Sequence, residues 1–403
     1  MGGAIAAGSN ETAAAGAKIL EAGGNAVDAA VGACLATAAG EPTLTSLAGG
    51  GVLLHRDGAS GELTLCDFFS NAPGLGAARP AAEIRESLDF YAVDLDFGPA
   101  IQRFYIGAAS AAVPGAIPGL FSAHERWGSL PIAEVVAPAC ELLREGVVLG
   151  EWQGNAAALL TPILTSTPSV ARHFAPTGRI IAAGDRWAIP QLADTLEALA
   201  REGWRTIYEG PLRRGLLASG GEAVGGLLTV ADLEAFEVAF RPPLAFDFRH
   251  QHVFTNPPPA AGGELIGLLL GLLESVPDDR REWGSETWLR ALGQAMRVVE
   301  EARGGDASAD NPLAPETLAR WRARLAAIID APLGATARIP GGPPSTTHVS
   351  VVDDAGNAAA VTFSYGEGNG RIVETEADGS FGFMMNNLLG EEDLFPGGLF
   401  SWP

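Results

Sequence analysis

The feature that most constrains the fold is a pair of predicted strands late in the chain. Residues 346–353 alternate like a strand, residues 357–364 are predicted as a second strand, and Asp354-Ala355-Gly356 makes a turn between them. A two-residue period interrupted by such a turn is typical of an antiparallel β-hairpin. A loop rich in proline and glycine, residues 339–345, comes directly before the first strand. We therefore expect an antiparallel pair of strands whose first residue is Thr346.

The rest of the chain mixes helical patterns with a few strands. Residues 11–38 are rich in alanine and break at Gly23-Gly24-Asn25, which predicts two helices joined by a turn. This mixture favours an α+β or layered α/β fold over a succession of βαβ units. Further strands are expected at 51–55, 63–68 and 244–255, and further helices at 131–145, 190–202, 229–237, 263–275, 285–303 and 315–330.

Composition and charge exclude several classes of protein. Hydrophobic residues make up 47% of the 403 residues and charged residues 18%, which provides material for a core and excludes a disordered chain. The formal net charge of −22 would repel phosphate backbones, so we expect no nucleic-acid partner. The longest apolar run, residues 265–273, is too short to span a bilayer, and no signal peptide is visible. We therefore expect a cytoplasmic protein without a membrane partner, unless the gene begins upstream.

No cofactor or metal is expected. Gly49-Gly50-Gly51 precedes a predicted strand, whereas a dinucleotide-binding glycine motif follows a strand and opens a helix. The sequence contains no P-loop and no GxSxG segment. His250 and His252 share a predicted strand but lack a visible third metal ligand. The three cysteines are widely separated, which argues against a disulfide framework or a zinc ribbon and favours buried thiols.

Thr346 is in an unusual place for a catalytic hydroxyl unless the chain is cut before it. A threonine hydroxyl is a weak nucleophile that needs a nearby base. If Thr346 became an N-terminus, its own α-amine, with a pKa of about 7.7–8.0, could accept the hydroxyl proton. Its Oγ could also make the cut by attacking the carbonyl of Ser345, which lies in a proline-rich loop able to strain that carbonyl. One residue would then supply both nucleophile and base.

The segment that begins at Thr346 resembles the start of the small subunit of γ-glutamyltransferases, which are N-terminal-nucleophile hydrolases. The resemblance rests on Thr346-Thr347-His348-Val349-Ser350-Val351-Val352-Asp353 and on residues 356–362. It covers nearly the whole chain, because other segments typical of the family follow one another in the same order. These are Gly23 to Ala30, Leu47 to Gly51, Ala112 to Gly115, Trp127-Gly128, Gly226 to Leu233 and Pro257 to Gly263.

The resemblance implies a four-layer αββα sandwich and a precursor that cleaves itself between Ser345 and Thr346. Residues 1–345 would form the large-subunit region and residues 346–403 a partial small-subunit region, and the two pieces would stay together as a heterodimer. Thr346 would be the catalytic nucleophile, and Ser364, in place of the usual second threonine, would hydrogen-bond it. The implied reaction is hydrolysis or transfer of γ-glutamyl amides such as glutathione through an ester on Thr346.

The resemblance also implies substrate-binding roles for Thr347, Asn387 and Glu391. Glu391 stands near the position of an aspartate that holds the substrate's α-ammonium group; the alternative is a solvated acidic turn. Phe69 replaces the family arginine that grips the substrate's α-carboxylate, and a phenyl ring cannot replace a bidentate clamp. Either another arginine, such as Arg103, takes this role, or the substrate lacks that carboxylate.

The chain ends at Pro403, whereas the family continues through a serine pair that contacts substrate and a Gly-Gly pair that forms the oxyanion hole. Losing one oxyanion donor typically lowers the rate about 10²–10³-fold. We therefore expect a truncated product or a fragment. Two alternatives stay open beside γ-glutamyl transfer. One is a related amidase or acylase with another substrate, similar to cephalosporin acylases, and the other is an inactive fragment.

Overall fold

The computed structural model describes residues 2–77, 84–98, 101–303, 311–333, 346–374 and 382–391. The chain divides into two compact units, of which the first comprises residues 1–241 and 341–394 and the second residues 242–340 and 395–403. Ser345 lies outside the described residues. The first unit therefore contains strands from both sides of the expected cleavage site, and the two units are described separately.

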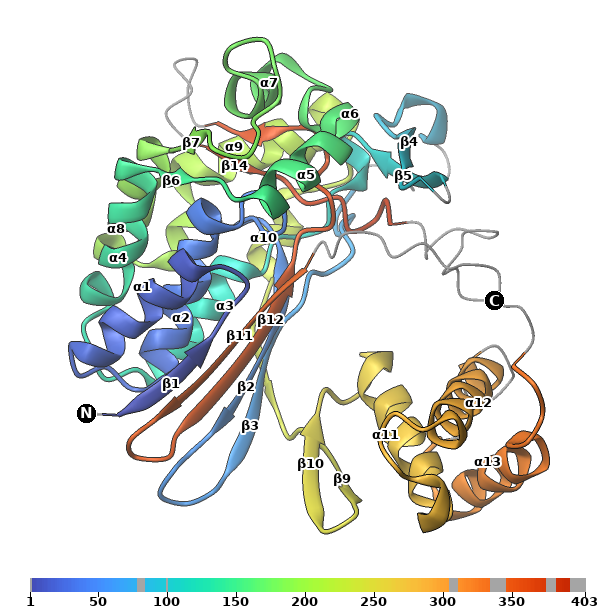
Figure 1. Cartoon of the computed structure of the whole chain (residues 1–403). Helices are drawn as coiled ribbons and strands as arrows, with labels where there is room; N and C mark the ends of the chain where they lie inside the picture. The colour runs from blue at the N-terminus through green and yellow to red at the C-terminus, as the bar shows by residue number, and fades with distance from the viewer. Residues whose placement is uncertain are drawn as a thin grey trace. The chain divides into compact units, whose positions relative to one another are not determined.

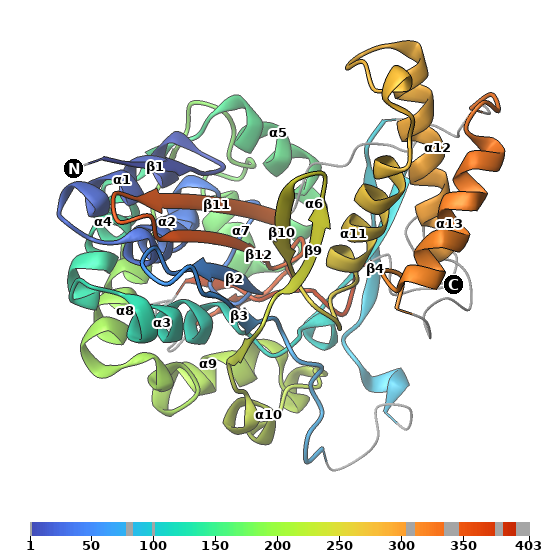
Figure 2. The ribbon, with the colours of Figure 1, turned by 90° about the horizontal axis from the view of Figure 1, so that it is seen from below.

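A six-stranded antiparallel sheet forms the centre of the first unit (Figure 1). In spatial order its strands are β1 (Gly3–Ala6), β11 (Thr346–Asp353), β12 (Ala358–Ser364), β2 (Gly50–Arg56), β3 (Leu63–Phe68) and β8 (Ala239–Arg241). Figure 2 shows β11, β12, β2 and β3 side by side in this order. The predicted hairpin is thus confirmed, and it lies between strands from the N-terminal part of the chain.

The two faces of the sheet differ in burial. Val349 and Val351 are buried, whereas Thr346 and His348 are exposed, because alternate residues of a strand point to opposite faces. Helices cover the face of the two valines (Figure 1). Helices α2 (Ala26–Gly40) and α3 (Ala116–Trp127) pack on the strands, while α1 (Asn10–Glu21) and α4 (Ile132–Glu145) pack on α2, and α8 (Pro190–Glu202) packs on α4.

Helix α2 explains the alanine-rich pattern of the N-terminal region. All of its residues are buried, because the sheet and the helices α1, α3 and α4 pack around it. A helix in this position needs no polar face, and small side chains allow the close approach on every side. The predicted break at Gly23-Gly24-Asn25 is confirmed, because α1 ends at Glu21 and Asn25 caps α2.

The remaining elements of the first unit lie mainly above the sheet in Figure 1, towards the end where β11 begins. Thr229 and Asp232 form a capping box at the start of α10 (Val230–Ala235), with reciprocal hydrogen bonds between side chains and backbone N–H groups. The helices among these remaining elements are α5 (Glu151–Leu159), α6 (Thr161–Leu164), α7 (Pro168–Phe174), α9 (Gly210–Gly220) and α10 (Val230–Ala235). The strand pairs are β4 (Tyr91–Asp96) with β5 (Ile101–Ile106), β6 (Val147–Val148) with β7 (Arg186–Trp187), and β13 (Ile372–Val373) with β14 (Phe383–Met384).

The second unit has a small core of its own. It consists of β9 (Leu244–Phe248) and β10 (Gln251–Thr255), which pair antiparallel, and of α11 (Ala261–Glu274), α12 (Glu286–Arg303) and α13 (Pro315–Ile328). Buried apolar side chains from the three helices pack together, among them Leu268, Leu272, Trp288, Val298 and Leu325.

The single strand expected over residues 244–255 is wrong. Arg249 and His250 form a turn between β9 and β10, and Arg249 has a positive φ of 49°. His250 and His252 therefore do not share a strand. His252 Nδ1 instead lies 2.6 Å from Asp247 Oδ1 on the paired strand.

The mixture of helices and an antiparallel sheet confirms the predicted α+β class. Within the described residues, the first unit supplies one helical layer and one six-stranded sheet of the implied four-layer sandwich. Among the helices that the structure describes, none combines the length and apolar character needed to cross a membrane. The three cysteines are free and buried, as expected, and burial raises the pKa of the Cys66 and Cys140 thiols to about 12.

Candidate active site

Thr346 and Ser364 lie opposite each other at one end of the sheet. Thr346 is the first residue of β11 and Ser364 is the last residue of β12, and the strand register pairs them directly. Thr346 is exposed and Ser364 is half-buried. Both belong to the face that the helices do not cover, so two hydroxyl side chains occur together on that face.

The glycine-rich segment at the start of β2 lies against Ser364. Gly50 pairs with Ser364, and a Cβ atom on Gly49 would lie 2.2 Å from the carbonyl oxygen of Ser364. A Cβ atom on Gly50 would lie 2.6 Å from both the backbone nitrogen and the hydroxyl of Ser70. The segment therefore needs glycine because three backbone segments meet here without room for side chains.

Glu391 is brought to the same end of the sheet. Gly366, two residues after Ser364, has a φ of 69°, and a Cβ atom there would lie 2.2 Å from Glu391 Oε1 and 2.1 Å from Asn387 Oδ1. The Glu391 carboxylate thus packs directly on the backbone of the turn that follows Ser364. The structure brings together Thr346, Ser364, Asn387 and Glu391, which are separated by up to 45 positions in the sequence.

The paired asparagines are hydrogen-bonded inside the protein, and Asn387 is the one that bonds to this turn. Asn387 Oδ1 accepts hydrogen bonds from the backbone N–H groups of Glu367 at 2.8 Å and Gly368 at 3.1 Å. Asn386 Oδ1 accepts from Ala112 N at 2.8 Å, and its amide nitrogen donates to the carbonyl oxygen of Ala48 at 2.8 Å. Both side chains are fully buried. Direct contact between Asn387 and a substrate stays a prediction.

The geometry does not support the expectation that Thr347 binds substrate. Its side chain is buried on the helical side of the sheet, opposite to Thr346, because successive strand residues face opposite ways. Thr347 Oγ1 donates a hydrogen bond to Glu41 Oε2 at 2.5 Å. Sequence reasoning missed Glu41, although an acidic residue that directly follows the apolar stretch 26–40 was an available signal.

Phe69 follows β3 and is 54% exposed. Neighbouring Asp67 forms an ion pair with Arg241, so that arginine already has an anionic partner. Arg103, the residue considered as a replacement for the family arginine, lies on β5 and forms a bidentate ion pair with Asp94, at 2.6 and 2.9 Å. The Asp94 carboxylate hydrogen-bonds this guanidinium and raises the pKa of Arg103 further.

His348 lies on the exposed face, two residues along β11 from Thr346. Its Nδ1 is 2.7 Å from Thr362 Oγ1 and its Nε2 is 2.8 Å from Ser350 Oγ. Partial burial lowers the pKa of His348, so the neutral imidazole is favoured. A neutral ring that bridges two hydroxyls ties β11 to β12 next to the proposed nucleophile.

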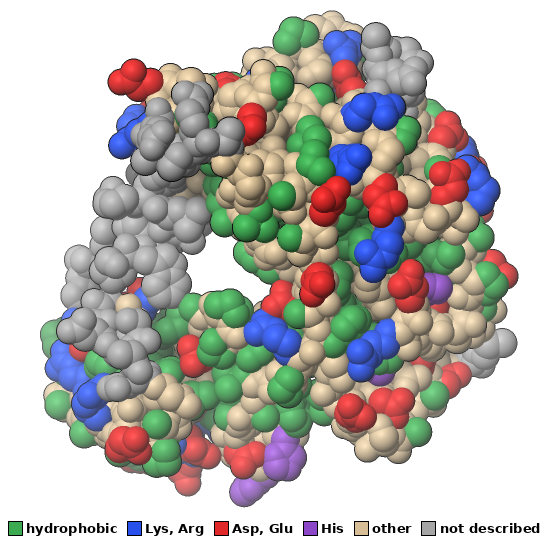
Figure 3. All heavy atoms as spheres, turned by 180° about the vertical axis from the view of Figure 1, so that it is seen from behind, with side chains coloured by type: hydrophobic (Ala, Val, Ile, Leu, Met, Phe, Trp, Pro, Cys, Tyr) green, Lys and Arg blue, Asp and Glu red, His purple; other side chains and the backbone are tan. Residues whose placement is uncertain are grey.

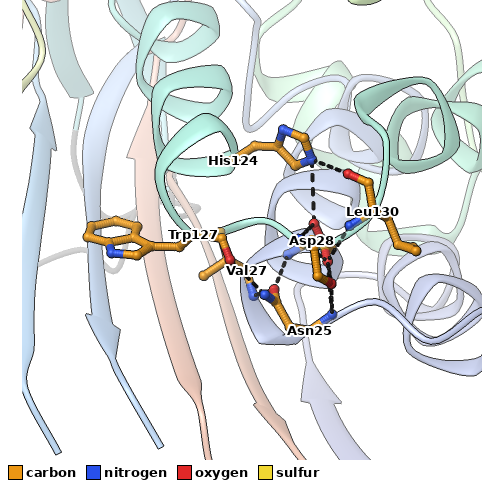
Figure 4. A network of polar contacts seen from close by, with 7 residues as sticks. Asn25, Val27, Asp28, His124, Trp127 and Leu130 are labelled. Atoms are coloured by element: carbon orange, nitrogen blue, oxygen red, sulfur yellow. Dashed lines mark hydrogen bonds and ion pairs between the residues drawn. The ribbon is translucent and has the colours of Figure 1, made fainter. Parts of the chain in front are cut away.

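The hairpin is fixed at its other end by the segment Gly23 to Ala30. Asp28 is buried and accepts hydrogen bonds from Asn25 N at 2.9 Å and Ser129 Oγ at 2.5 Å, while His124 Nε2 lies 3.4 Å away (Figure 4). Ala26 N donates to Asp353 Oδ2 at 2.9 Å, which connects the start of α2 to the end of β11. This family segment is therefore structural and lies away from Thr346.

A cavity of about 450 Å³ occurs near this second end of the sheet. It is lined by Gly24, Asn25, Asp353 and Asn357, among others, and it does not include Thr346. We therefore assign no substrate to it. Among the residues that the structure describes, no three His, Cys, Asp or Glu side chains are grouped so that they could hold a metal ion.

Positively and negatively charged side chains are mixed, and do not form separate patches, on the surface seen in Figure 3. Arginine and acidic side chains are interspersed there over the first unit. Ion pairs of the first unit include Arg144 with Asp194 and Glu197, and Arg179 with Asp185. Exposed pairs of this kind contribute little to stability.

Comparisons with family models and with known sequences point to the same family. The family model described as Gamma-glutamyltranspeptidase matches residues 12–396. The Acylase ACY 1 proenzyme of Pseudomonas sp. (strain V22) is 31% identical over 95% of this chain and 68% of its own length. The Glutathione hydrolase proenzyme of Pseudomonas aeruginosa is 30% identical over 98% of this chain and 69% of its own length.

Solved structures of similar proteins give the same result. The γ-glutamyltranspeptidase from Pseudomonas nitroreducens, complexed with L-DON, superposes with a TM-score of 0.67 and 26% identity, covering 85% of this chain and 98% of its own. The cephalosporin acylase from Bacillus halodurans has the same fold, with a TM-score of 0.76 and 23% identity over all of this chain and 72% of its own. The chain therefore belongs to the γ-glutamyltranspeptidase family, a family of enzymes with the N-terminal-nucleophile hydrolase fold.

Proposed function

We propose that this chain is cut between Ser345 and Thr346 and that Thr346 is then the nucleophile of an amide acyl transfer. The observation that carries the proposal is the position of Thr346. It is the first residue of its strand, is exposed, and is paired with a second hydroxyl residue, Ser364. Two relatives are named as proenzymes, which supports synthesis as a precursor.

The proposed acyl transfer uses the hydroxyl and the α-amine of Thr346, the substrate, and an acceptor, which is water or a second amine. Thr346 Oγ attacks the amide carbonyl while the free α-amine of Thr346 takes the hydroxyl proton. The same amine then gives this proton to the departing amine as the carbon–nitrogen bond breaks, which leaves an ester on Oγ. Water or a second amine attacks that ester and gives a proton to the α-amine. The α-amine passes a proton to Oγ as the ester carbon–oxygen bond breaks, which releases the acyl product and restores Thr346. The Ser364 hydroxyl supports Thr346 by hydrogen bonding.

The two pieces would remain associated after the cut. Strand β11 pairs with β1, and β12 pairs with β2, so each strand of the hairpin has a neighbour from the other piece. The buried side chains Val349, Val351 and Val361 also belong to the core formed with α2. Residues 1–345 and 346–403 would therefore form a heterodimer held by one shared sheet.

γ-Glutamyl amides such as glutathione are the leading substrate class. Glu391 places a carboxylate beside the turn after Ser364, where it can bind the α-ammonium group of a γ-glutamyl substrate. Relatives named glutathione hydrolase support this choice.

A second candidate is an acyl group that lacks the α-carboxylate. Phe69 cannot hold a carboxylate, and Arg103 and Arg241 are each paired with an aspartate. Relatives named acylase support this reading. The reaction on Thr346 would be the same, and only the group recognised at Phe69 would differ.

Three p-nitroanilides that differ by one group separate the two candidates. The γ-glutamyl compound carries both the amine and the carboxylate, the 4-aminobutanoyl compound lacks the carboxylate, and the glutaryl compound lacks the amine. The leading candidate predicts the highest kcat/KM for the γ-glutamyl compound. Equal or faster turnover of the 4-aminobutanoyl compound would favour the second candidate. Turnover by the Thr346→Ala variant at the wild-type rate would contradict both.

A further inference from the structure

Glu41 is a buried carboxylate that the acyl transfer described above does not use. It follows α2, and none of its surface is exposed. Its Oε1 accepts a hydrogen bond from Thr12 Oγ1 at 2.7 Å, and its Oε2 accepts from Thr347 Oγ1 at 2.5 Å. Burying a carboxylate is costly unless its oxygens are hydrogen-bonded, so these two hydroxyl groups offset part of that cost.

The carboxylate is closely surrounded by backbone. A Cβ atom on Gly8 would lie 2.4 Å from Glu41 Oε2 and 2.9 Å from Thr347 Oγ1. A Cβ atom on Gly40 would lie 3.0 Å from Thr12 Oγ1. Because side chains are absent at both glycines, the segment between β1 and α1 lies against the hydrogen bond between Glu41 and Thr347, and the end of α2 lies against the hydroxyl of Thr12. The position of Thr347 is therefore fixed from the helical side.

We propose that Glu41 is a positioning residue that fixes the place of Thr346 by holding Thr347 from the opposite face of the sheet. Thr347 is covalently bonded to Thr346, so its side chain is the nearest point of β11 at which the helical layer can hold the nucleophile. The inference rests on the proposed role of Thr346. The hydrogen bond between Glu41 and Thr347 also joins the region before the proposed cut to the region after it. It therefore persists once the peptide bond between Ser345 and Thr346 is broken.

Substitutions on both sides of the bond test this role in the full chain. Thr347→Val keeps the shape and removes the hydroxyl, Thr347→Ser keeps the hydroxyl, and Glu41→Gln removes the charge. Thr43→Val is the matched control, because buried Thr43 lies two residues after Glu41 and donates its side-chain hydrogen bond to Gln153 Oε1, at 2.8 Å, rather than to β11. The readouts are the rate constant for cleavage between Ser345 and Thr346, kcat, KM and Tm.

We expect Thr347→Val and Glu41→Gln to slow cleavage and to lower kcat about 10- to 100-fold with little change in KM, because small displacements of a reacting group have effects of this size. Thr347→Ser should restore most of the rate. Thr43→Val should lower Tm by a similar amount and leave both rates near wild type. Equal slowing by Thr43→Val, or no slowing by Thr347→Val, would overturn the proposal.

Hydrogen exchange tests the positioning role of Glu41 independently of the proposed function. In the Thr346→Ala background, where no cleavage is expected, Glu41→Gln and Thr347→Val should speed amide exchange of residues 347–349 about tenfold relative to Thr43→Val. Unchanged exchange would overturn the positioning role even if Thr346 is the nucleophile. If the unaltered chain is not cut at all, the proposed function fails, and the exchange result still decides the role of Glu41.

Discussion

Among single residues, Phe69 has the largest expected effect on substrate choice. It is exposed next to Ser70, which lies against Gly50 and therefore close to Ser364. A cation at this position could form a charge-assisted hydrogen bond with a carboxylate, and a phenyl ring cannot. The identity of this one side chain therefore separates acyl groups with and without an α-carboxylate.

Replacing Phe69 by arginine should select for the carboxylate. We expect Phe69→Arg to raise kcat/KM for the γ-glutamyl anilide about 10- to 100-fold relative to the 4-aminobutanoyl anilide, as a charged hydrogen bond contributes about 1.5–3 kcal/mol. Phe69→Leu is the control and should leave the ratio unchanged. A ratio that stays constant in Phe69→Arg would show that the acyl group does not reach this position.

Glu391, by contrast, should bind the amine of the substrate's acyl group. We expect Glu391→Gln to lower kcat/KM about 10- to 100-fold for the γ-glutamyl and 4-aminobutanoyl anilides, because both contain the amine. The glutaryl anilide lacks the amine and should be unaffected. An equal loss with all three compounds would instead indicate that Glu391 supports the turn at Gly366.

At the level of elements, the β11–β12 hairpin is held at both ends by residues of the N-terminal region. Glu41 binds the residue next to Thr346, and the start of α2 binds Asp353 at the end of β11. The buried Asp28 connects the same start of α2 to the turn after α3 (Figure 4). The position of the proposed nucleophile thus depends on helix ends that are far away in the sequence.

Removing the charge of Asp28 should destabilise the first unit. We expect Asp28→Asn to lower the free energy of unfolding by about 2–3 kcal/mol, because a buried acceptor of several backbone and hydroxyl hydrogen bonds is lost. Chemical denaturation measures this change. Asp57→Asn is the matched control, because Asp57 is only partly buried and also accepts from two backbone N–H groups and one hydroxyl. A similar, small effect of the two substitutions would contradict the structural role of Asp28.

At the level of the whole molecule, the period of two residues predicts the hairpin, and breaks in helical pattern predict most helix boundaries. The turn at Arg249 and His250 was missed because strand-forming residues flank it without glycine or proline. The closeness of Glu391 to Ser364 comes from the fold around Gly366 and has no local signal. The role of Glu41 also depends on tertiary contact, since Thr12 and Thr347 are far from it in sequence.

Acid should destabilise the whole molecule in a defined range of pH. Burial lowers the pKa of His55, His173 and His348, so the unfolded chain binds protons more readily than the folded chain below about pH 6.5. The stability due to neutral histidines is therefore complete above about pH 6.5 and is lost as pH falls from there towards the lowered pKa values. We expect Tm to fall between about pH 6.5 and 5.5, and to fall less in a variant with glutamine at the three positions.

Carboxylates affect the stability of the protein in a separate, lower range of pH. The Arg179 guanidinium hydrogen-bonds Asp185 and lowers its pKa to about 2. Its contribution is present above the ordinary aspartate pKa and is lost only as pH falls from about 4 towards 2. A Tm that stays constant between pH 7 and 5.5 would therefore contradict the role assigned to the three histidines.

The most direct test of the account is the intact mass of the purified chain beside that of its Thr346→Ala variant. The account predicts that the wild-type chain yields two masses, those of residues 1–345 and 346–403, and that these pieces elute together under native conditions. The variant should remain one chain of full mass. A single uncut chain in both proteins, or the same two pieces from the variant, would contradict the claim that Thr346 cleaves the chain and becomes its nucleophile.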